Sequence, residues 1–254
     1  MAAARAAFGE DSRYLVGGQS LVQAMKLRLS TSATRVDLGS IDELRAIRGE
    51  EAEFRIGAMA THAAIPAAAE VRRVVPALAD LAQHIGNPMV RNMGTLGGAV
   101  ANADPAADYS AAVLALGATV HTDRRSIASG AFFTGLFETA LEPGELITAI
   151  SFSAARRAGY AKFRQPASRF ALIGVFVADT DSGIRVAVTG AKGAVFRAEP
   201  VEAALSKCFT PEAIRSVKMP ADGINGDLHG SAVCRAALIT VVAARAVATA
   251  LGSN

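Results

Sequence analysis

The stretch from Ile85 to Asp108, IGNPMVRNMGTLGGAVANADPAAD, constrains this chain more than any other. At its centre, residues 94–98 read GTLGG, so glycines and a hydroxyl lie close together. Glycine adopts positive φ at little cost, and paired glycines therefore let successive backbone N–H groups converge on one point. Such a nest of N–H groups binds anions, phosphate above all. The sequence predicts a phosphate-binding loop here.

A second loop of the same kind, Val16–Ser20 (VGGQS), lies upstream. The apolar run 13–16 predicts a strand, and Ser20 is expected to cap the helix that follows, with Leu27 and Leu29 on its apolar face. Phosphate is favoured at such a strand-to-helix turn. Two nests in one domain indicate a ligand with two phosphates, such as a dinucleotide. Neither loop is a P-loop or a GxGxxG fingerprint with its later acidic residue.

The pattern of apolar residues divides the chain in two. Strands are expected at 13–16, 35–38, 54–57, 118–121 and 145–152. Helices are expected over 71–85 and from Asp104-Pro105 through Leu116. This alternation predicts a mixed α/β domain over 1–152. The remainder, 153–254, reads as an α+β domain with a hairpin (172–178 and 184–190) and helices at 199–206, 211–217 and 231–251. The boundary is expected near 151–157.

Composition excludes several classes of function. The net charge is +3 without a basic run, and the chain has no Trp and three Tyr, which argues against nucleic-acid binding. Cys208 and Cys234 are the only cysteines, whereas an iron–sulfur cluster needs about four. The four histidines lack metal-ligand spacing. No metal site and no catalytic constellation is predicted.

The sequence favours a cytoplasmic protein. It shows no signal peptide at its N-terminus. The most apolar long run, 231–251, contains Arg235 and Arg245, whereas a membrane span carries few or no charges. We therefore expect a buried amphipathic helix there rather than a membrane span.

The two loops, with GELITAISFS and GYAKFRQPASRFALIGVFVA further on, resemble the FAD-binding medium subunit of the molybdenum hydroxylases. Carbon monoxide dehydrogenase, xanthine dehydrogenase and the bacterial N-heterocycle dehydrogenases form this family. The resemblance spans most of the chain. It implies a two-part FAD-binding domain followed by a smaller C-terminal α+β domain. It also implies that FAD is the cofactor.

The resemblance assigns the cofactor contacts residue by residue. The two loops would hold the FAD pyrophosphate through backbone N–H groups, Asn102 and Asp108 would contact phosphate or sugar hydroxyls, and Ile85, Leu146 and Lys162 would lie near the rings. The full set is Val16, Gly17, Gly18, Gln19, Ser20, Ile85, Thr95, Leu96, Gly97, Gly98, Ala99, Asn102, Asp108, Leu146 and Lys162.

By the same resemblance, the chain is an electron relay. A large partner subunit would carry molybdopterin, a small one would carry two [2Fe–2S] clusters, and FAD would pass electrons to an acceptor in a dimer of heterotrimers. Two departures stand out: Ala99 replaces the family's usual Asn, and the chain starts closer to its first loop than is usual. These two departures leave open the alternative that the chain is a non-catalytic nucleotide-binding module. A standalone FAD-dependent reductase is the other alternative.

Overall fold

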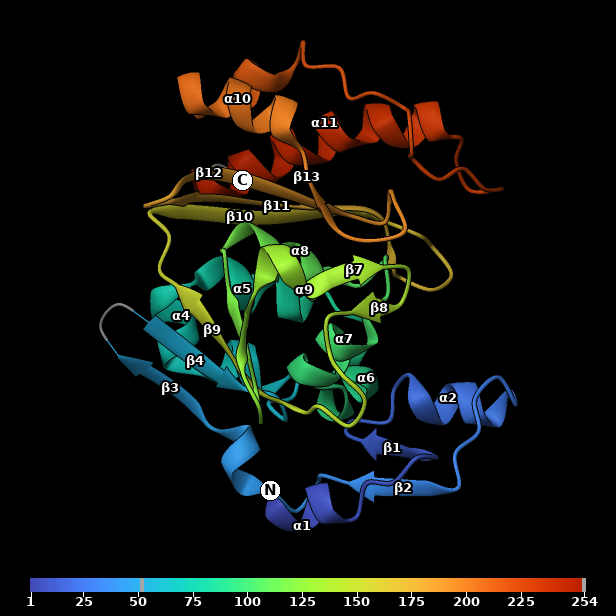
Figure 1. The fold of residues 1–254 in the computed structure, drawn as a ribbon. Helices are drawn as coiled ribbons and strands as arrows, with labels where there is room; N and C mark the ends of the chain where they lie inside the picture. The colour runs from blue at the N-terminus through green and yellow to red at the C-terminus, as the bar shows by residue number, and fades with distance from the viewer. Residues whose placement is uncertain (51–52, 253–254) are drawn as a thin grey trace.

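The computed structural model describes residues 1–50 and 53–252, and three hydrophobic cores divide them. In Figure 1 the corresponding layers lie one above another, from the N-terminal strands through a middle layer of helices and sheet to the C-terminal sheet and its helices. The fold is mixed α and β, as the sequence predicted.

The N-terminal layer is a small parallel βαβ unit. Its elements are α1 (Ala2–Ala6), β1 (Ser12–Leu15), α2 (Leu21–Lys26), β2 (Thr34–Asp37) and the 3₁₀-helix η1 (Asp42–Arg45). β1 pairs with β2 in parallel, and α2 forms the crossover between them. The predicted apolar face of α2 is wrong at its end, because the helix stops at Lys26, Arg28 takes a φ of 57°, and Leu27 and Leu29 are exposed.

The middle layer contains a five-stranded antiparallel sheet in the order β3-β4-β9-β5-β6. Its strands are β3 (Ile47–Glu50), β4 (Glu53–Gly57), β5 (Thr119–Thr122), β6 (Ser126–Ala128) and β9 (Ile147–Ser153). Its helices are α3 (Ala64–Ala67), α4 (Ala69–Val74), α5 (Pro76–Gln83), α6 (Pro88–Met93), α7 (Leu96–Asn102), α8 (Asp108–Ala115) and α9 (Ser129–Phe132). A short hairpin, β7 (Phe133–Gly135) with β8 (Glu138–Thr139), lies beside them.

Two predicted helices of this layer have different bounds in the structure. The helix expected over 71–85 is split at Val75, where Pro76 starts α5 and provides no N–H to continue α4. The helix expected from Asp104-Pro105 begins only at Asp108. The residues before it form a turn in which Ala106 N–H donates to Asp104 Oδ1 at 2.8 Å.

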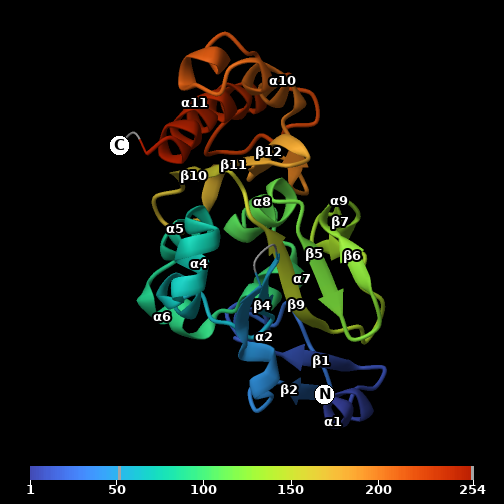
Figure 2. The ribbon, with the colours of Figure 1, turned by 90° about the vertical axis from the view of Figure 1, so that its left-hand side faces the viewer.

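The C-terminal layer is an antiparallel sheet with helices on both faces. Its strands are β10 (Arg157–Arg164), β11 (Ala171–Thr180), β12 (Gly183–Thr189) and β13 (Phe196–Arg197), and its helices are α10 (Glu199–Lys207), η2 (Pro211–Ile214) and α11 (Ala232–Ala250). The predicted hairpin is β11–β12, whereas the helix expected at 211–217 is the shorter 3₁₀-helix η2. α11 covers one face of the sheet, and α5 and α8 contact the other (Figures 1 and 2).

Helix α11 is long and apolar enough to cross a membrane by length and composition. In the structure it packs along β10 and β11, and Ile239, Val242 and Ala246 on its inner face are buried in the C-terminal core. This packing supports its assignment as a core helix. We propose the domain boundary in the segment 153–157, where the chain leaves β9 and enters the separate sheet that begins with β10.

Candidate cofactor cavity

The first glycine loop connects β1 to α2 and lies against the end of α6. Gly18 has a φ of +69°, a backbone conformation that residues with side chains rarely adopt. A Cβ atom on Gly17 would lie 2.1 Å from the carbonyl oxygen of Met93. Gly18 is therefore required by the positive φ of the turn, and Gly17 is required by the close approach of the Met93 backbone.

The same loop offers unused hydrogen-bond donors. Within the described residues, the backbone N–H groups of Gly17, Gly18, Gln19 and Ser20 donate to no other protein group. Ser20 precedes α2, but its side chain forms none of the expected cap hydrogen bonds. A row of backbone N–H groups that no other protein group accepts is available to bind an anion.

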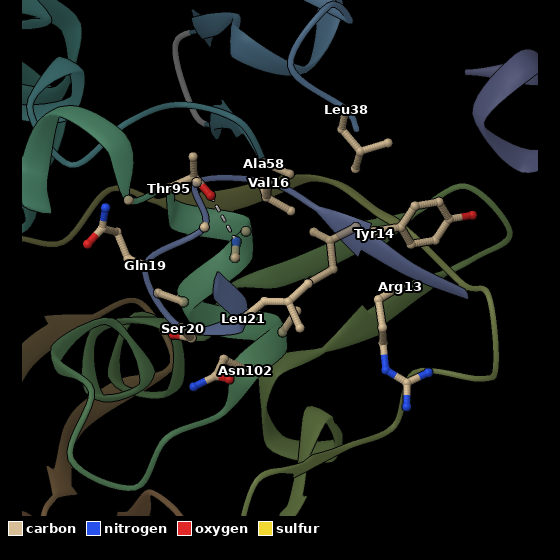
Figure 3. Close-up of a pocket in the computed structure, with 18 of the residues that line it drawn as sticks. Arg13, Tyr14, Val16, Gln19, Ser20, Leu21, Leu38, Ala58, Thr95 and Asn102 are labelled. Atoms are coloured by element: carbon tan, nitrogen blue, oxygen red, sulfur yellow. Dashed lines mark hydrogen bonds between the residues drawn. The ribbon is translucent and has the colours of Figure 1, made fainter. Parts of the chain in front are cut away.

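The second glycine segment is a helix start rather than the expected nest. Neither Gly97 nor Gly98 has a positive φ, and both lie in the first turn of α7. The Gly97 N–H donates to the Ala58 carbonyl at 2.9 Å. The Gly98 N–H donates to Thr95 Oγ1 at 3.1 Å, which is the dashed line in Figure 3. Leu96 donates in the same way to a backbone carbonyl. The prediction that this segment offers a row of free N–H groups is therefore wrong.

Close packing explains the glycines of the second segment. A Cβ atom on Gly97 would lie 2.5 Å from the Cβ of Ala58, and one on Gly98 would lie 2.8 Å from Thr95 Oγ1. The absence of side chains thus allows α7 to start directly against β4. The two glycine segments then approach each other, since Val16 lies 3.8 Å from the position of a Gly98 Cβ.

A cavity of about 1030 Å³ lies between the two glycine segments. Predicted cofactor residues that line it are Val16, Gly17, Gly18, Gln19, Ser20, Thr95, Gly97, Gly98, Ala99, Asn102 and Leu146. Figure 3 shows Ser20 and Asn102 on one side of this space and Leu38 on another. Leu96, Ile85, Asp108 and Lys162 were also predicted, but they do not line it.

The remaining walls come from residues that the sequence did not single out. Arg13 and Tyr14 of β1, Leu38 after β2, and the half-exposed Phe137 and Phe170 all line the cavity. No local motif marks these positions, because they reach the cavity only when the layers pack together.

An ion pair between the exposed Arg125 and the buried Glu145 positions Leu146. The preceding Glu145 accepts hydrogen bonds from Arg125 at 3.0 Å and from Thr122 at 2.8 Å. The hydrogen bond from the Arg125 guanidinium lowers the pKa of Glu145 to about 2. Leu146 N–H donates to Asp123 Oδ1 at 2.9 Å. The turn before β9 is therefore fixed by charged partners on both sides.

The predicted residues Asp108 and Lys162 contact each other. Lys162 Nζ lies 2.9 and 3.1 Å from the two carboxylate oxygens of Asp108, and the Tyr160 hydroxyl donates to the same carboxylate. Burial raises the pKa of Asp108, and the Lys162 charge opposes that rise. Ile85 is partly buried against the middle core. The Asp108 and Lys162 side chains are therefore bound to each other, whereas Ile85 keeps part of its surface exposed.

His62 is a cavity residue that sequence reasoning missed. It follows β4, is 5% exposed, and its Nδ1 atom has no hydrogen-bond partner among the described residues. Its ring centroid lies 5.3 Å from that of Tyr109. Burial, followed by the nearby charge of Arg91, lowers the pKa of His62 to about 4. The ring is therefore neutral near pH 7.

The cavity fits a dinucleotide. Its volume is at the upper end of the range for small-molecule sites, roughly 300–1,000 Å³. Four free N–H groups suit a diphosphate, and apolar side chains such as Leu38, Met59 and Leu146 suit flat rings. Fold and cavity together define a dinucleotide-binding protein of mixed α/β architecture.

Comparison with known proteins identifies the family. Residues 1–153 match the family described as the FAD binding domain in molybdopterin dehydrogenase. The nicotine 6-hydroxylase medium subunit of Paenarthrobacter nicotinovorans is 32% identical over 255 residues, which cover 95% of this chain and 90% of that protein. The carbon monoxide dehydrogenase medium chain of Hydrogenophaga pseudoflava is 32% identical over 239 residues, which cover 86% and 83%.

Comparison with solved structures identifies the same family. A carbon monoxide dehydrogenase from Hydrogenophaga pseudoflava superposes with a TM-score of 0.88 at 33% identity, over 99% of this chain and 93% of that chain. Quinoline 2-oxidoreductase from Pseudomonas putida 86 gives a TM-score of 0.84 at 26% identity, over 96% and 90%. The chain belongs to the FAD-binding medium subunits of the molybdenum hydroxylases.

The chain is thus an FAD-dependent oxidoreductase subunit, and both the family and the cofactor predicted from the sequence are confirmed. In this family the molybdenum and iron–sulfur centres belong to partner subunits.

Proposed function

We propose that this chain relays electrons from [2Fe–2S] clusters on a small partner subunit, through its own FAD, to an external acceptor. A large partner subunit carries molybdopterin and oxidises the organic substrate. The observation that carries the proposal is the dinucleotide-sized cavity beside a glycine loop with four free N–H groups. It is supported by relatives named as medium chains of carbon monoxide dehydrogenase and nicotine 6-hydroxylase.

The residues of this chain bind and orient the cofactor. The loop Val16–Ser20 provides backbone donors for the diphosphate, and the apolar walls exclude water from the rings. Bound FAD supplies two-electron redox chemistry, which links one-electron clusters to a two-electron acceptor such as NAD⁺. The alternatives to NAD⁺ as the acceptor are a quinone, oxygen and a carrier protein.

The cysteines support electron entry from another polypeptide. Cys208 and Cys234 are free and exposed, and the described residues contain no group of three or more His, Cys, Asp or Glu arranged to hold a metal. An iron–sulfur cluster needs about four cysteine ligands. We therefore propose that a partner's cluster docks near the FAD cavity in a cytoplasmic complex, a dimer of heterotrimers.

Purification of the protein with its native partners tests this proposal. We expect size-exclusion chromatography to show one peak that contains flavin absorbance near ~450 nm together with molybdenum and iron. Reduction of the complex by its substrate should bleach the flavin, whereas the isolated chain with FAD should show no hydroxylase turnover. A single metal-free chain that oxidises an organic substrate at full rate would support the standalone reductase instead. A colourless chain that binds no FAD would support the non-catalytic module.

A further inference from the structure

The loop between α7 and α8 forms part of the border of the FAD cavity. Asn102, at the end of α7, and Asp104 in the loop both line the cavity, and Asp108 begins α8. The loop is folded on itself, because Ala106 N–H donates to Asp104 Oδ1 at 2.8 Å and Ala107 N–H donates to the Asp104 carbonyl at 2.9 Å. Its position therefore determines where Asp104 lies at the cavity border, directly after Asn102.

Residues at the end of β12, in the C-terminal layer, hold the carbonyl groups of this loop. Gly190 N–H donates to the Pro105 carbonyl at 2.7 Å. The Thr189 hydroxyl lies within hydrogen-bond distance of two carbonyls, that of Pro105 and, at 2.9 Å, that of Ala107. A hydroxyl has a single proton, so the two carbonyls share one donor. The hydroxyl thereby ties the middle of the loop and its last residue, Ala107, to the C-terminal sheet.

Residues on β10 hold the far end of the loop. Tyr160 and Lys162 both donate to the Asp108 carboxylate. The Lys162 side chain is 2% exposed, so water does not compete for these hydrogen bonds. Removal of a donor from a buried carboxylate costs more than an exposed contact would.

The sequence of the C-terminal sheet is adapted to this contact. Gly174 on β11 is paired with Lys162 on one side and Thr189 on the other. A Cβ atom at Gly174 would lie 2.7 Å from Thr189 Cγ2 and 2.8 Å from the Tyr160 hydroxyl oxygen. The missing side chain lets these two hydroxyl-bearing residues converge on one loop. Gly190, with a φ of +86°, then turns the chain so that its N–H reaches the loop.

We infer that Thr189 and Tyr160 are positioning residues for the cofactor: they hold the Asp104–Asp108 loop against the FAD cavity and so set the affinity for FAD. The C-terminal domain thus contributes to cofactor retention through residues that do not line the cavity. This inference rests on FAD binding in the cavity and is independent of the route by which electrons reach it.

The test compares Thr189→Val with Thr189→Ser in the full-length chain. Valine keeps the shape of threonine and removes the donor, whereas serine keeps the donor. The dissociation constant for FAD is measured by titration of the flavin-free protein, and thermal unfolding without FAD is measured in parallel. We expect Thr189→Val to raise the dissociation constant about tenfold, equivalent to about 1.4 kcal/mol. Thr189→Ser should stay within about twofold of the wild type.

Tyr160→Phe is the second variant, and it decides the matter if Thr189→Val does not fold. It removes one hydroxyl from Asp108 and should also weaken FAD binding about tenfold. The inference is overturned if folded Thr189→Val or Tyr160→Phe binds FAD as tightly as the wild type. Equal weakening in Thr189→Ser and Thr189→Val would also overturn it, because the hydroxyl would then be irrelevant. If the wild type bound no FAD, the assignment of the cavity to FAD would be wrong. The positioning role of Thr189 and Tyr160 would then be wrong as well.

Discussion

The free energy of unfolding of this chain should fall as the pH drops from about 6.5 to about 4. Protonation of His62 should account for part of that loss, and the two pKa values of His62 give its size. In the folded chain His62 is buried and its pKa is lowered to about 4. In the unfolded chain it returns to the ordinary value of 6.5. Between these values only the unfolded state binds the proton, so acid favours unfolding.

The size of the effect follows from the two pKa values. A tenfold difference in proton affinity is worth about 1.4 kcal/mol. Relative to pH 7.5, His62 should therefore cost the folded state about 2 kcal/mol at pH 5 and about 3 kcal/mol at pH 4. The sign follows from the direction of the shift: the stability is fully present above pH 6.5 and is lost as pH falls through the window.

The measurement is urea-induced unfolding of the flavin-free chain at pH 7.5, 6 and 5, followed by circular dichroism. His62→Gln is the matched variant, since glutamine is polar but does not titrate. Carboxylates titrate in both proteins, so the difference between them isolates His62. We expect the variant to gain about 2 kcal/mol relative to the wild type between pH 7.5 and pH 5.

A difference that stays constant with pH would refute this reasoning. It would mean that the ring reaches solvent in the folded chain and binds its proton normally. An NMR titration of the His62 ring gives an independent answer. A midpoint near 6.5 in the folded protein would show that neither burial nor Arg91 controls the charge of this cavity wall.

Two further changes test the site. Gly17→Ala should abolish FAD retention, measured by flavin absorbance, because the new Cβ would lie 2.1 Å from the Met93 carbonyl oxygen; Gly130→Ala, with nothing within 4 Å, is the control and should retain FAD. Lys162→Met should lower the free energy of unfolding by about 3–5 kcal/mol in urea, because it leaves the buried Asp108 carboxylate without its cation. Adding Asp108→Asn should recover part of that loss, and no recovery would show that the two residues are not coupled.

Much of the fold was predictable where the signal is local. The β11–β12 hairpin follows from two β-rich runs around a short polar turn, 179–183. The turn at Gly18 follows from the freedom of glycine to adopt positive φ. The long helix α11 follows from its apolar periodicity and the cap that Ser231 provides to Cys234 N–H. In each case neighbouring residues determine the conformation.

Prediction failed where distant parts of the chain decide. Pro105 looked like the first turn of a helix, but its carbonyl is held by Thr189 and Gly190 from another layer, and the helix starts later. The contact of Asp108 and Lys162 with the cofactor stays a prediction, but the ion pair between them could not be predicted from residues so far apart in sequence. The glycines of the second segment were interpreted by their φ, although close packing on Ala58 explains Gly97.

Residues from all three layers line the cavity, so cofactor binding depends on the packing of the layers against one another. Leu38 belongs to the N-terminal core, Thr95 lies in the middle layer, and Phe170 precedes β11 in the C-terminal layer. A ligand that contacts all of them binds only when the layers are packed, so it stabilises their contacts as well as its own site. By mass action, FAD at a hundred times its dissociation constant adds about 2.7 kcal/mol to folding stability. Because the walls come from different layers, much of this gain should appear as resistance to separation of the layers. We therefore expect the glycine loop, the α7–α8 loop and the C-terminal sheet to unfold as one cooperative unit.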